Sequence, residues 1–294
     1  MTVNAVSNAP LSPSITRLAL CASACAAAIL AQPAGADSKT FNPVADATLI
    51  QPDSGGGQWA NGGSYNYYCG RVGANGAGTL RRGLLRFDLS AIPPGSTITA
   101  VTVKMYMSQS QSTAQTCALH RVTSSWTEGI TFNFGGGGGS PDGPDVTWSH
   151  RSYPAQAWNT PGGDFVATAS ASKSIGSAGF YTFTSNAGLI ADVQAWVNTP
   201  SSNFGWLMKG NEATLQTAKR FEARESGDPA RWPLLTVTYT PPATPGDLNG
   251  DHRVDGTDLG LLLAAWGGTG TADLNQDGHV DGSDLGLLLS YWTP

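Results

Sequence analysis

The sequence has little charge, few cysteines and few histidines. Only 13% of its 294 residues are charged, and it holds four cysteines and four histidines. So few cysteines exclude a disulfide-dense scaffold. Lysine and arginine form no basic stripe, so the charge pattern indicates no nucleic-acid partner. Beyond residue 36, no apolar run is long enough to cross a bilayer, and we expect no membrane span.

The first 36 residues have the pattern of an export signal. Arg17 precedes an apolar stretch, residues 18–31, that is too short to span a bilayer, and Ala34-Gly35-Ala36 is a small-x-small cleavage site. The alternative is a buried N-terminal helix. We predict a signal peptide over residues 1–36, cleavage near Asp37, and a protein that is secreted, extracellular or at the cell surface.

Charge divides the remaining chain into two parts. Residues 37–245 carry 14 basic and 13 acidic side chains, whereas residues 246–294 hold eight aspartates and one arginine. The acidic part would repel itself unless cations neutralise it. The Pro-rich segment 241–245 stands between the two parts and is predicted to be a linker.

The acidic part contains one motif twice, at an offset of 26 residues. Residues 246–258 return as residues 272–284, and a Leu-rich run follows each copy. Oxygen-bearing side chains occupy positions 1, 3, 5, 9 and 12 of each loop, and a backbone carbonyl would serve at position 7, as a twelve-residue calcium loop requires. The alternative is an acidic, solvated loop without metal. The sequence therefore predicts two Ca²⁺ ions. The predicted ligands are Asp247, Asn249, Asp251, the Arg253 carbonyl, Asp255 and Asp258 in the first loop, and Asp273, Asn275, Asp277, the His279 carbonyl, Asp281 and Asp284 in the second.

These paired loops resemble a type I dockerin. The resemblance implies a small all-α, calcium-binding C-terminal module that docks onto a cohesin-like domain of a scaffold or cell-surface protein. The sequence departs from the family in three ways. His252 replaces the usual glycine at loop position 6, which is expected to strain the first turn. Gly256 and Gly282 take position 10, where many dockerins carry a partner-contacting Ser or Thr, so Thr257 and Ser283 at position 11 are the candidate partner-binding residues. The helices also lack the basic residues common near their ends.

The neutral part, residues 37–240, has the pattern of short strands separated by turns. Between residues 101 and 108, apolar and polar side chains alternate, as in a half-buried strand. Further strands are expected over residues 83–89, 117–122, 165–169, 179–184, 204–209, 219–224 and 234–239, with a helix over 187–197. The Gly- and Asn-rich stretch that holds Trp59, Tyr65, Tyr67 and Tyr68 is expected to be a loop. Short strands with Gly- and Pro-rich connections predict a mainly β fold, an antiparallel, jelly-roll-like β-sandwich.

Four stretches of this part carry a second resemblance. They are residues 84–95, 120–129, 221–226 and 233–237. Together they resemble a DNRLRE (disaggregatase-related) domain over roughly residues 44–240. Relatives of that β-sandwich occur beside polysaccharide-active enzymes, and some bind carbohydrate. The sequence departs from the pattern after Glu128, where Phe132-Asn133-Phe134 and five glycines replace a more regular stretch.

The resemblance directs attention to side chains that could bind a polysaccharide. Aromatic faces stack on sugar rings, and Arg can hold hydroxyl or carboxylate groups. The candidates are Trp59, Tyr67, Arg81, Arg82 and Trp148. The alternative is that several of these rings belong to the core.

Catalysis has weaker support. No nucleophile motif is convincing. Glu128 and Glu225 are a conceivable carboxylate pair for glycoside cleavage, but their neighbours Trp126 and Arg224 favour a structural role. We therefore expect a non-catalytic protein that binds polysaccharide within a larger assembly. A glycoside hydrolase or lyase subunit and a structural cell-envelope protein remain as alternatives.

Two cysteines follow residue 36, Cys69 and Cys117. An even number in an exported chain predicts one disulfide bond. The alternative is a pair of free, buried thiols.

Overall fold

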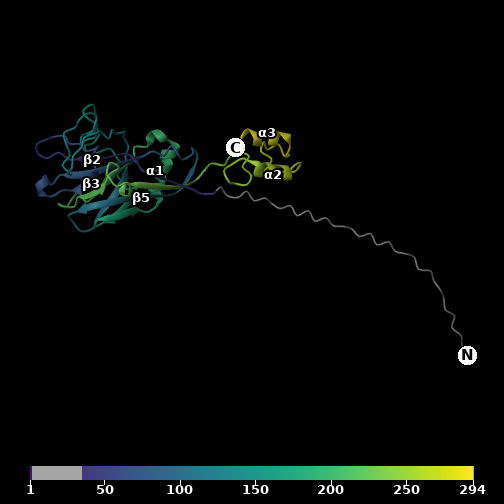
Figure 1. Ribbon diagram of the computed structural model, residues 1–294, viewed down its shortest axis with the longest axis horizontal. Coiled ribbons are helices and arrows are strands. Elements are labelled where there is room, and N and C mark those ends of the chain that lie inside the picture. The colour runs from purple at the N-terminus through teal and green to yellow at the C-terminus, as the bar shows by residue number, and fades with distance from the viewer. Residues whose placement is uncertain (2–34, 294) are drawn as a thin grey trace.

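The computed structural model describes Met1 and residues 35–293 (Figure 1). Most of the predicted signal peptide, residues 2–34, lies outside the described residues. Within the described part, no helix is both long enough and apolar enough to cross a membrane.

Antiparallel strands dominate the chain up to Thr240. They are β1 (Asp37–Phe41), β2 (Pro43–Ile50), β3 (Asn66–Arg71), β4 (Leu80–Phe87), β5 (Thr97–Ser110), β6 (Gln115–Arg121), β7 (His150–Ser152), β8 (Gln156–Ala157), β9 (Ala171–Ile175), β10 (Gly179–Phe183), β11 (Trp206–Lys209), β12 (Lys219–Glu222) and β13 (Leu234–Thr240). Helix α1 (Ala187–Asn198) lies between β10 and β11, and short 3₁₀ helices occur at η1 (Ala74–Gly76), η2 (Pro200–Ser202) and η3 (Pro229–Arg231). The predicted mainly β fold is confirmed.

Eleven of these strands form one curled sheet that folds over into two layers. The order is β1-β13-β5-β12-β3-β4-β11-β6-β9, with β10 paired to β5 and β2 paired to β4. The turn from one layer to the other falls within β3, where Cys69 pairs with β12 but Gly70 and Arg71 pair with β4. Gly70 has a φ of 107°, and a Cβ there would lie 2.8 Å from the Thr217 carbonyl oxygen. The corner therefore requires glycine.

The main hydrophobic core fills the space between the two layers. The apolar residues of β5, from Val101 to Met107, are completely buried in it, as their alternation predicts. Leu85 and Phe87 of β4 pack against them from the other layer. Successive residues point to opposite faces of a strand, so Leu84 lies in a second cluster on the outer side of β4. There the connection between β6 and β9 covers the sheet with Trp126, Trp148, Trp158 and other side chains.

Helix α1 packs on the main core with its apolar face. Leu189, Val193 and Trp196 are buried in that core. Asn186 caps the helix, since its side-chain oxygen accepts hydrogen bonds from the backbone N–H groups of Gly188 at 2.8 Å and Leu189 at 3.0 Å. The predicted helix is thus present, with a recognisable start.

One predicted strand is wrong, and six observed strands were not predicted. Residues 165–169 form no strand; Phe165 makes only an isolated bridge to Val122, and the strand in this region is β9. The strands that were not predicted are β1, β2, β3, β7, β8 and β9. Strand β2 is buried at seven of its eight positions, so its sequence lacks the polar alternation that marks a half-buried strand.

The C-terminal part of the chain has its own small core. Helices α2 (Gly256–Ala264) and α3 (Gly282–Ser290) each follow one acidic loop, and they lie together beyond the linker in Figure 1. The core is built from Val254, Leu262, Ala272, Val280 and Leu288. Backbone hydrogen bonds join the two halves. The N–H of Gly267 donates to the Val280 carbonyl at 2.8 Å, and that of Thr293 donates to the Val254 carbonyl at 3.0 Å.

Candidate functional site

The first acidic loop brings carboxylates from its two ends together. Oxygen atoms of Asp247, Asp251 and Asp258 all lie within 4.8 Å of one another. The Asp247 carboxylate, at position 1, accepts hydrogen bonds from the backbone N–H groups of Gly250 at 2.7 Å and His252 at 2.9 Å, and the loop backbone therefore curves around it. Such convergent oxygens are the donor set that a hard divalent cation prefers. The residues of this loop therefore fit calcium.

The carboxylate at position 12 is fixed by the start of the following helix. Asp258 is fully buried. One of its oxygens accepts a hydrogen bond from the backbone N–H of Leu248 at 2.8 Å, and the other accepts one from that of Asp255 at 2.9 Å. Asp255 in turn caps α2, completing a capping box. The helix start thereby holds position 12 beside position 1.

The second loop repeats this arrangement. Asp284 is fully buried and accepts hydrogen bonds from the backbone N–H groups of Leu274 at 2.7 Å and Asp281 at 2.8 Å. Asp273 accepts one from that of Gly278 at 2.8 Å. The capping box is also present at the start of α3. The repeated motif thus gives a repeated geometry, although the ligand sets themselves, including the Arg253 and His279 carbonyls, stay predictions.

Hydrogen bonds favour the charged form of two of these carboxylates. A hydrogen bond from the Asn249 side chain, with a further one from the backbone N–H of Arg253, lowers the pKa of Asp251. A hydrogen bond from the backbone N–H of Asp281 does the same for the pKa of Asp284. Calcium requires deprotonated carboxylates, so both groups are prepared for the ion.

Positions 4 and 6 of each loop adopt the left-handed backbone conformation. The φ angles are 80° at Gly250 and 67° at His252 in the first loop, and 61° at Gln276 and 95° at Gly278 in the second. Only glycine takes this conformation cheaply. The strained turn expected at His252 therefore has a counterpart at Gln276, and each loop carries one strained residue.

The candidate partner-binding residues lie on the surface of the C-terminal module. Thr257 and Ser283 are exposed in the first turns of α2 and α3. Large apolar side chains are also exposed at equivalent places in the two halves: Leu263 and Leu289, and Trp266 and Trp292. The repeat thus presents similar side chains on its two helices and just after them.

Tyr67 cannot take its predicted role in carbohydrate binding. Its ring is fully buried in the main core and stacks on Phe221, with 5.3 Å between the ring centroids. A ring with no exposed face cannot stack on a sugar. Tyr67 lies on β3, where its side chain points inward and that of Tyr68 is partly exposed. The predicted loop is therefore wrong for Asn66–Arg71, where neighbouring Gly and Asn residues obscure a short alternation of buried and partly exposed side chains.

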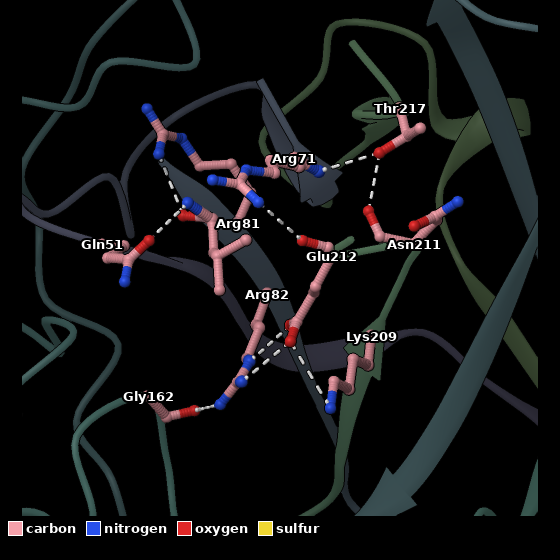
Figure 2. A network of polar contacts seen from close by, with 10 residues as sticks. Gln51, Arg71, Arg81, Arg82, Gly162, Lys209, Asn211, Glu212 and Thr217 are labelled. Carbon is pink, nitrogen blue, oxygen red and sulfur yellow. Dashed lines mark hydrogen bonds and ion pairs between the residues drawn. The ribbon is translucent and has the colours of Figure 1, made fainter. Parts of the chain in front are cut away.

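Arg82 and Trp148 contact each other and have a structural role. The Arg82 guanidinium donates to both carboxylate oxygens of Glu212, at 2.7 and 3.1 Å, and to the Gly162 carbonyl at 2.7 Å, as Figure 2 shows. It also lies 4.8 Å from the ring centroid of Trp148, which is itself buried. Lys209 approaches the same Glu212 carboxylate at 3.4 Å. The Arg82 guanidinium and the Trp148 ring, both predicted to bind carbohydrate, are therefore engaged within the protein.

Arg81 is buried, but its hydrogen-bond partners are neutral oxygen atoms rather than a carboxylate. Arg81 donates to the Gly136 carbonyl at 2.6 Å and to the Thr79 hydroxyl at 2.8 Å. Burial lowers the pKa of Arg81 to about 10, so it stays charged at neutral pH. Arg81 lines a groove on the surface of the sandwich. Trp59 is half-buried and remains a candidate.

Glu128 and Glu225 belong to a partly buried ion-pair cluster. Their carboxylates and that of Asp46 lie within 4.8 Å of one another. Arg224 joins them, contacting Glu128 at 2.5 Å and Glu225 at 2.9 Å. Burial raises the pKa of Asp46 well above its usual range and the pKa of Glu225 to about 7. The Asp46 backbone N–H also donates to Glu128 at 2.6 Å. The cluster thus ties β2 to the segments that follow β6 and β12.

The predicted disulfide is not present. Cys69 and Cys117 are free and fully buried, with their sulfur atoms 3.4 Å apart. A disulfide bond requires a separation of about 2.05 Å. The contact is a hydrogen bond between thiols, which together with burial raises the pKa of Cys69 well above its usual value. The alternative of two buried thiols describes the structure.

Comparison with protein families identifies two parts of the chain. A model of the type I dockerin domain matches residues 245–292, and a model of carbohydrate-binding module family 96 matches residues 38–134. The first match supports the dockerin resemblance, and dockerin domains of this type bind calcium. The second match shows a carbohydrate-binding module in the sandwich, whereas the DNRLRE resemblance is not confirmed. No curated protein matches the chain.

Proposed function

We propose that this protein is a non-catalytic, exported carbohydrate-binding subunit. Its sandwich binds polysaccharide, and its C-terminal module, loaded with two calcium ions, attaches it to a cohesin-bearing or cell-surface assembly. The observation that carries the proposal is the presence, in one chain, of a carbohydrate-binding module match and a dockerin match. A tether and a binding module together recruit an assembly to its polysaccharide.

The calcium loops support the tethering half of the proposal. The ions would neutralise converging carboxylates and fix the two loops, and with them the relative placement of α2 and α3. The exposed hydroxyls of Thr257 and Ser283 and the apolar side chains of the two helices would then form the partner surface. We expect a cohesin from the same organism to bind the full chain in calcium and to dissociate in chelator.

The alternative of a glycan-active enzyme rests on one observation, the closeness of the Glu128 and Glu225 carboxylates. Arg224 binds both of them, and Glu128 also accepts a backbone hydrogen bond. A carboxylate engaged in this way is poorly placed to attack a sugar or to activate water. The geometry therefore favours binding without cleavage.

The test of the proposal measures binding and cleavage together. Purified protein would be examined by affinity electrophoresis and calorimetry against xylan, galactomannan, laminarin, polygalacturonate and alginate, with release of reducing ends followed in parallel. We expect binding to at least one polysaccharide and no release. Cleavage that is lost in Glu128→Gln or Glu225→Gln would establish an enzyme instead, and no binding to any glycan would refute the proposal.

Export is tested separately. Mass spectrometry of the protein from culture medium should give an N-terminus near Asp37, as the cleavage pattern predicts. A protein that stays in the cytoplasm with its first residues intact would contradict this part of the proposal.

A further inference from the structure

A groove on the sandwich combines side-chain types suited to a sugar. It has a volume of about 580 Å³ and is lined by β3, β4, β5, η1 and the Gly-rich loop at residues 134–137. The residues that line it include the aromatic Tyr68 and Phe134 and the basic Arg81 and Arg220. We propose that this groove, rather than the predicted residues Tyr67, Arg82 and Trp148, is the oligosaccharide-binding site. The inference rests on the proposed function and gives it a location.

The Gly-rich loop is a packed wall of the groove. A Cβ on Gly136 would lie 3.1 Å from the Tyr68 ring, so the loop backbone lies directly on that ring. Gly139 is joined to Ala60 by two backbone hydrogen bonds of 2.9 Å. The Arg81 guanidinium donates a hydrogen bond to the Gly136 carbonyl of this loop at 2.6 Å. These contacts fix the loop, and the close approach to the Tyr68 ring favours glycine at position 136.

An exposed cluster of aromatic rings borders the groove. Phe134 is 82% exposed, Tyr65 48% and Phe132 40%. The ring centroids are 4.7 Å apart for Phe132 and Phe134, and 5.1 Å apart for Tyr65 and Phe132. Contiguous exposed apolar side chains of this kind mark binding surfaces. Phe134 also lines the groove, so it joins the aromatic surface to the polar one.

The segment that carries these rings is anchored before any ligand arrives. Asp145 is fully buried and accepts hydrogen bonds from the Thr131 backbone N–H at 3.1 Å and from its hydroxyl at 2.7 Å. The backbone N–H of Asn133 donates to the Ser64 hydroxyl at 2.9 Å. A platform held in place loses little conformational entropy when it binds, which favours affinity.

The polar lining suits the hydroxyl groups of a sugar chain. The amides of Gln109, Gln111 and Gln216 line the groove and both donate and accept hydrogen bonds. Arg220 is held by the Ser108 hydroxyl at 3.0 Å through Nε. Aromatic faces bind the apolar faces of sugar rings, while guanidinium and amide groups bind their oxygens. The expected ligand is therefore an oligosaccharide segment lying along the groove with a ring against Phe134.

Two substitutions test the assignment. Phe134→Ala removes the exposed ring and should weaken binding about fivefold. Gly137→Trp should abolish binding by filling the groove, since a Cβ at Gly137 meets no atom within 4 Å. The matched controls are Phe180→Ala, another exposed ring, and Gly227→Trp, another glycine with open space. Neither residue lines the groove, so both controls should bind as the wild type does.

The probe is whichever of xylan, galactomannan, laminarin, polygalacturonate and alginate the wild type binds most tightly, measured by calorimetry with circular dichroism as a check on folding. Wild-type affinity in both Phe134→Ala and Gly137→Trp would overturn the assignment and leave the proposed function standing. Failure of the wild type to bind any of the five would overturn both. If Gly137→Trp fails to fold, Phe134→Ala decides alone, because so exposed a ring contributes little to stability.

Discussion

The left-handed residues of the two calcium loops give a sharp test of the loop geometry. Gln276 and Gly278 occupy positions 4 and 6 of the second loop with φ angles of 61° and 95°. Gln276→Gly should relieve strain, and Gly278→Ala should introduce it. His252→Gly is a less direct test, since its side chain also contacts the Gly35 carbonyl at 3.2 Å.

The expected magnitude follows from two opposing terms. A non-glycine residue in the left-handed region costs about 1–2 kcal/mol. Glycine loses more backbone freedom on folding than glutamine does, and this loss offsets about 0.4–1 kcal/mol of the strain that the substitution relieves. Gln276→Gly should thus stabilise the module by about 0.5–1 kcal/mol. Because calcium binds the folded loop, the apparent calcium affinity should rise about two- to fivefold.

Calorimetric titration of the full chain with calcium provides the measurement, and Gly282→Ala provides the control. Added Cβ atoms at Gly278 and Gly282 meet no atom within 4 Å, so neither substitution causes a clash. Gly282 begins α3, where alanine is favoured, so Gly282→Ala should be neutral or stabilising. Gly278→Ala should weaken binding. Equal effects of these two substitutions, or weaker binding in Gln276→Gly, would refute the argument.

Three further predictions concern folding, thiols and pH. Chelator should reduce the helical circular dichroism signal, and Asp258→Ala with Asp284→Ala should abolish its response to calcium; unchanged helicity in chelator would contradict calcium-linked folding. Under denaturing conditions without reductant, alkylation should label Cys69 and Cys117, and mass spectrometry showing them linked would contradict the structure. Burial raises the pKa of Glu225 from 4.5 to about 7, so the folded state holds this proton more tightly than the unfolded chain does. Its contribution to stability is full below pH 4.5 and is lost as pH rises through about 7. Between those pH values the free energy of unfolding should fall by about 1 kcal/mol after solvent screening, and the unfolding temperature should fall with it. Glu225→Gln should make the unfolding temperature less dependent on pH.

Periodicity and spacing predicted the parts of the fold whose determinants are local. The alternation in β5 and the Asn-capped helix α1 could be read directly, because each depends on neighbours in sequence. The acidic loops could be predicted for the same reason, since all the predicted calcium ligands lie within twelve consecutive residues. Strand β2 lacked such a signal because it is buried on both faces.

The carbohydrate surface depends on long-range packing and could not be predicted in the same way. Tyr67 and Tyr68 are adjacent, yet one ring is buried and the other lines the groove. Only the pairing of β3 with β12 decides which ring is buried. The groove also requires Arg220, far away in sequence. The exposed rings of Phe132 and Phe134 lie in the stretch that departs from the DNRLRE pattern. That departure was the one sequence feature that pointed to this surface.

The size of the C-terminal core explains why calcium should matter to the whole protein. Five buried side chains, four of them aliphatic residues larger than alanine, make up this core, while the same segment holds eight aspartates and one arginine. So small a core supplies little free energy, and the like charges oppose folding. Metal ions that bind only the folded loops would supply the missing free energy. Calcium-loop modules outside the cell can bind as weakly as about 10⁻⁴–10⁻³ M. The tether would then form where calcium is abundant, which accords with the proposed export.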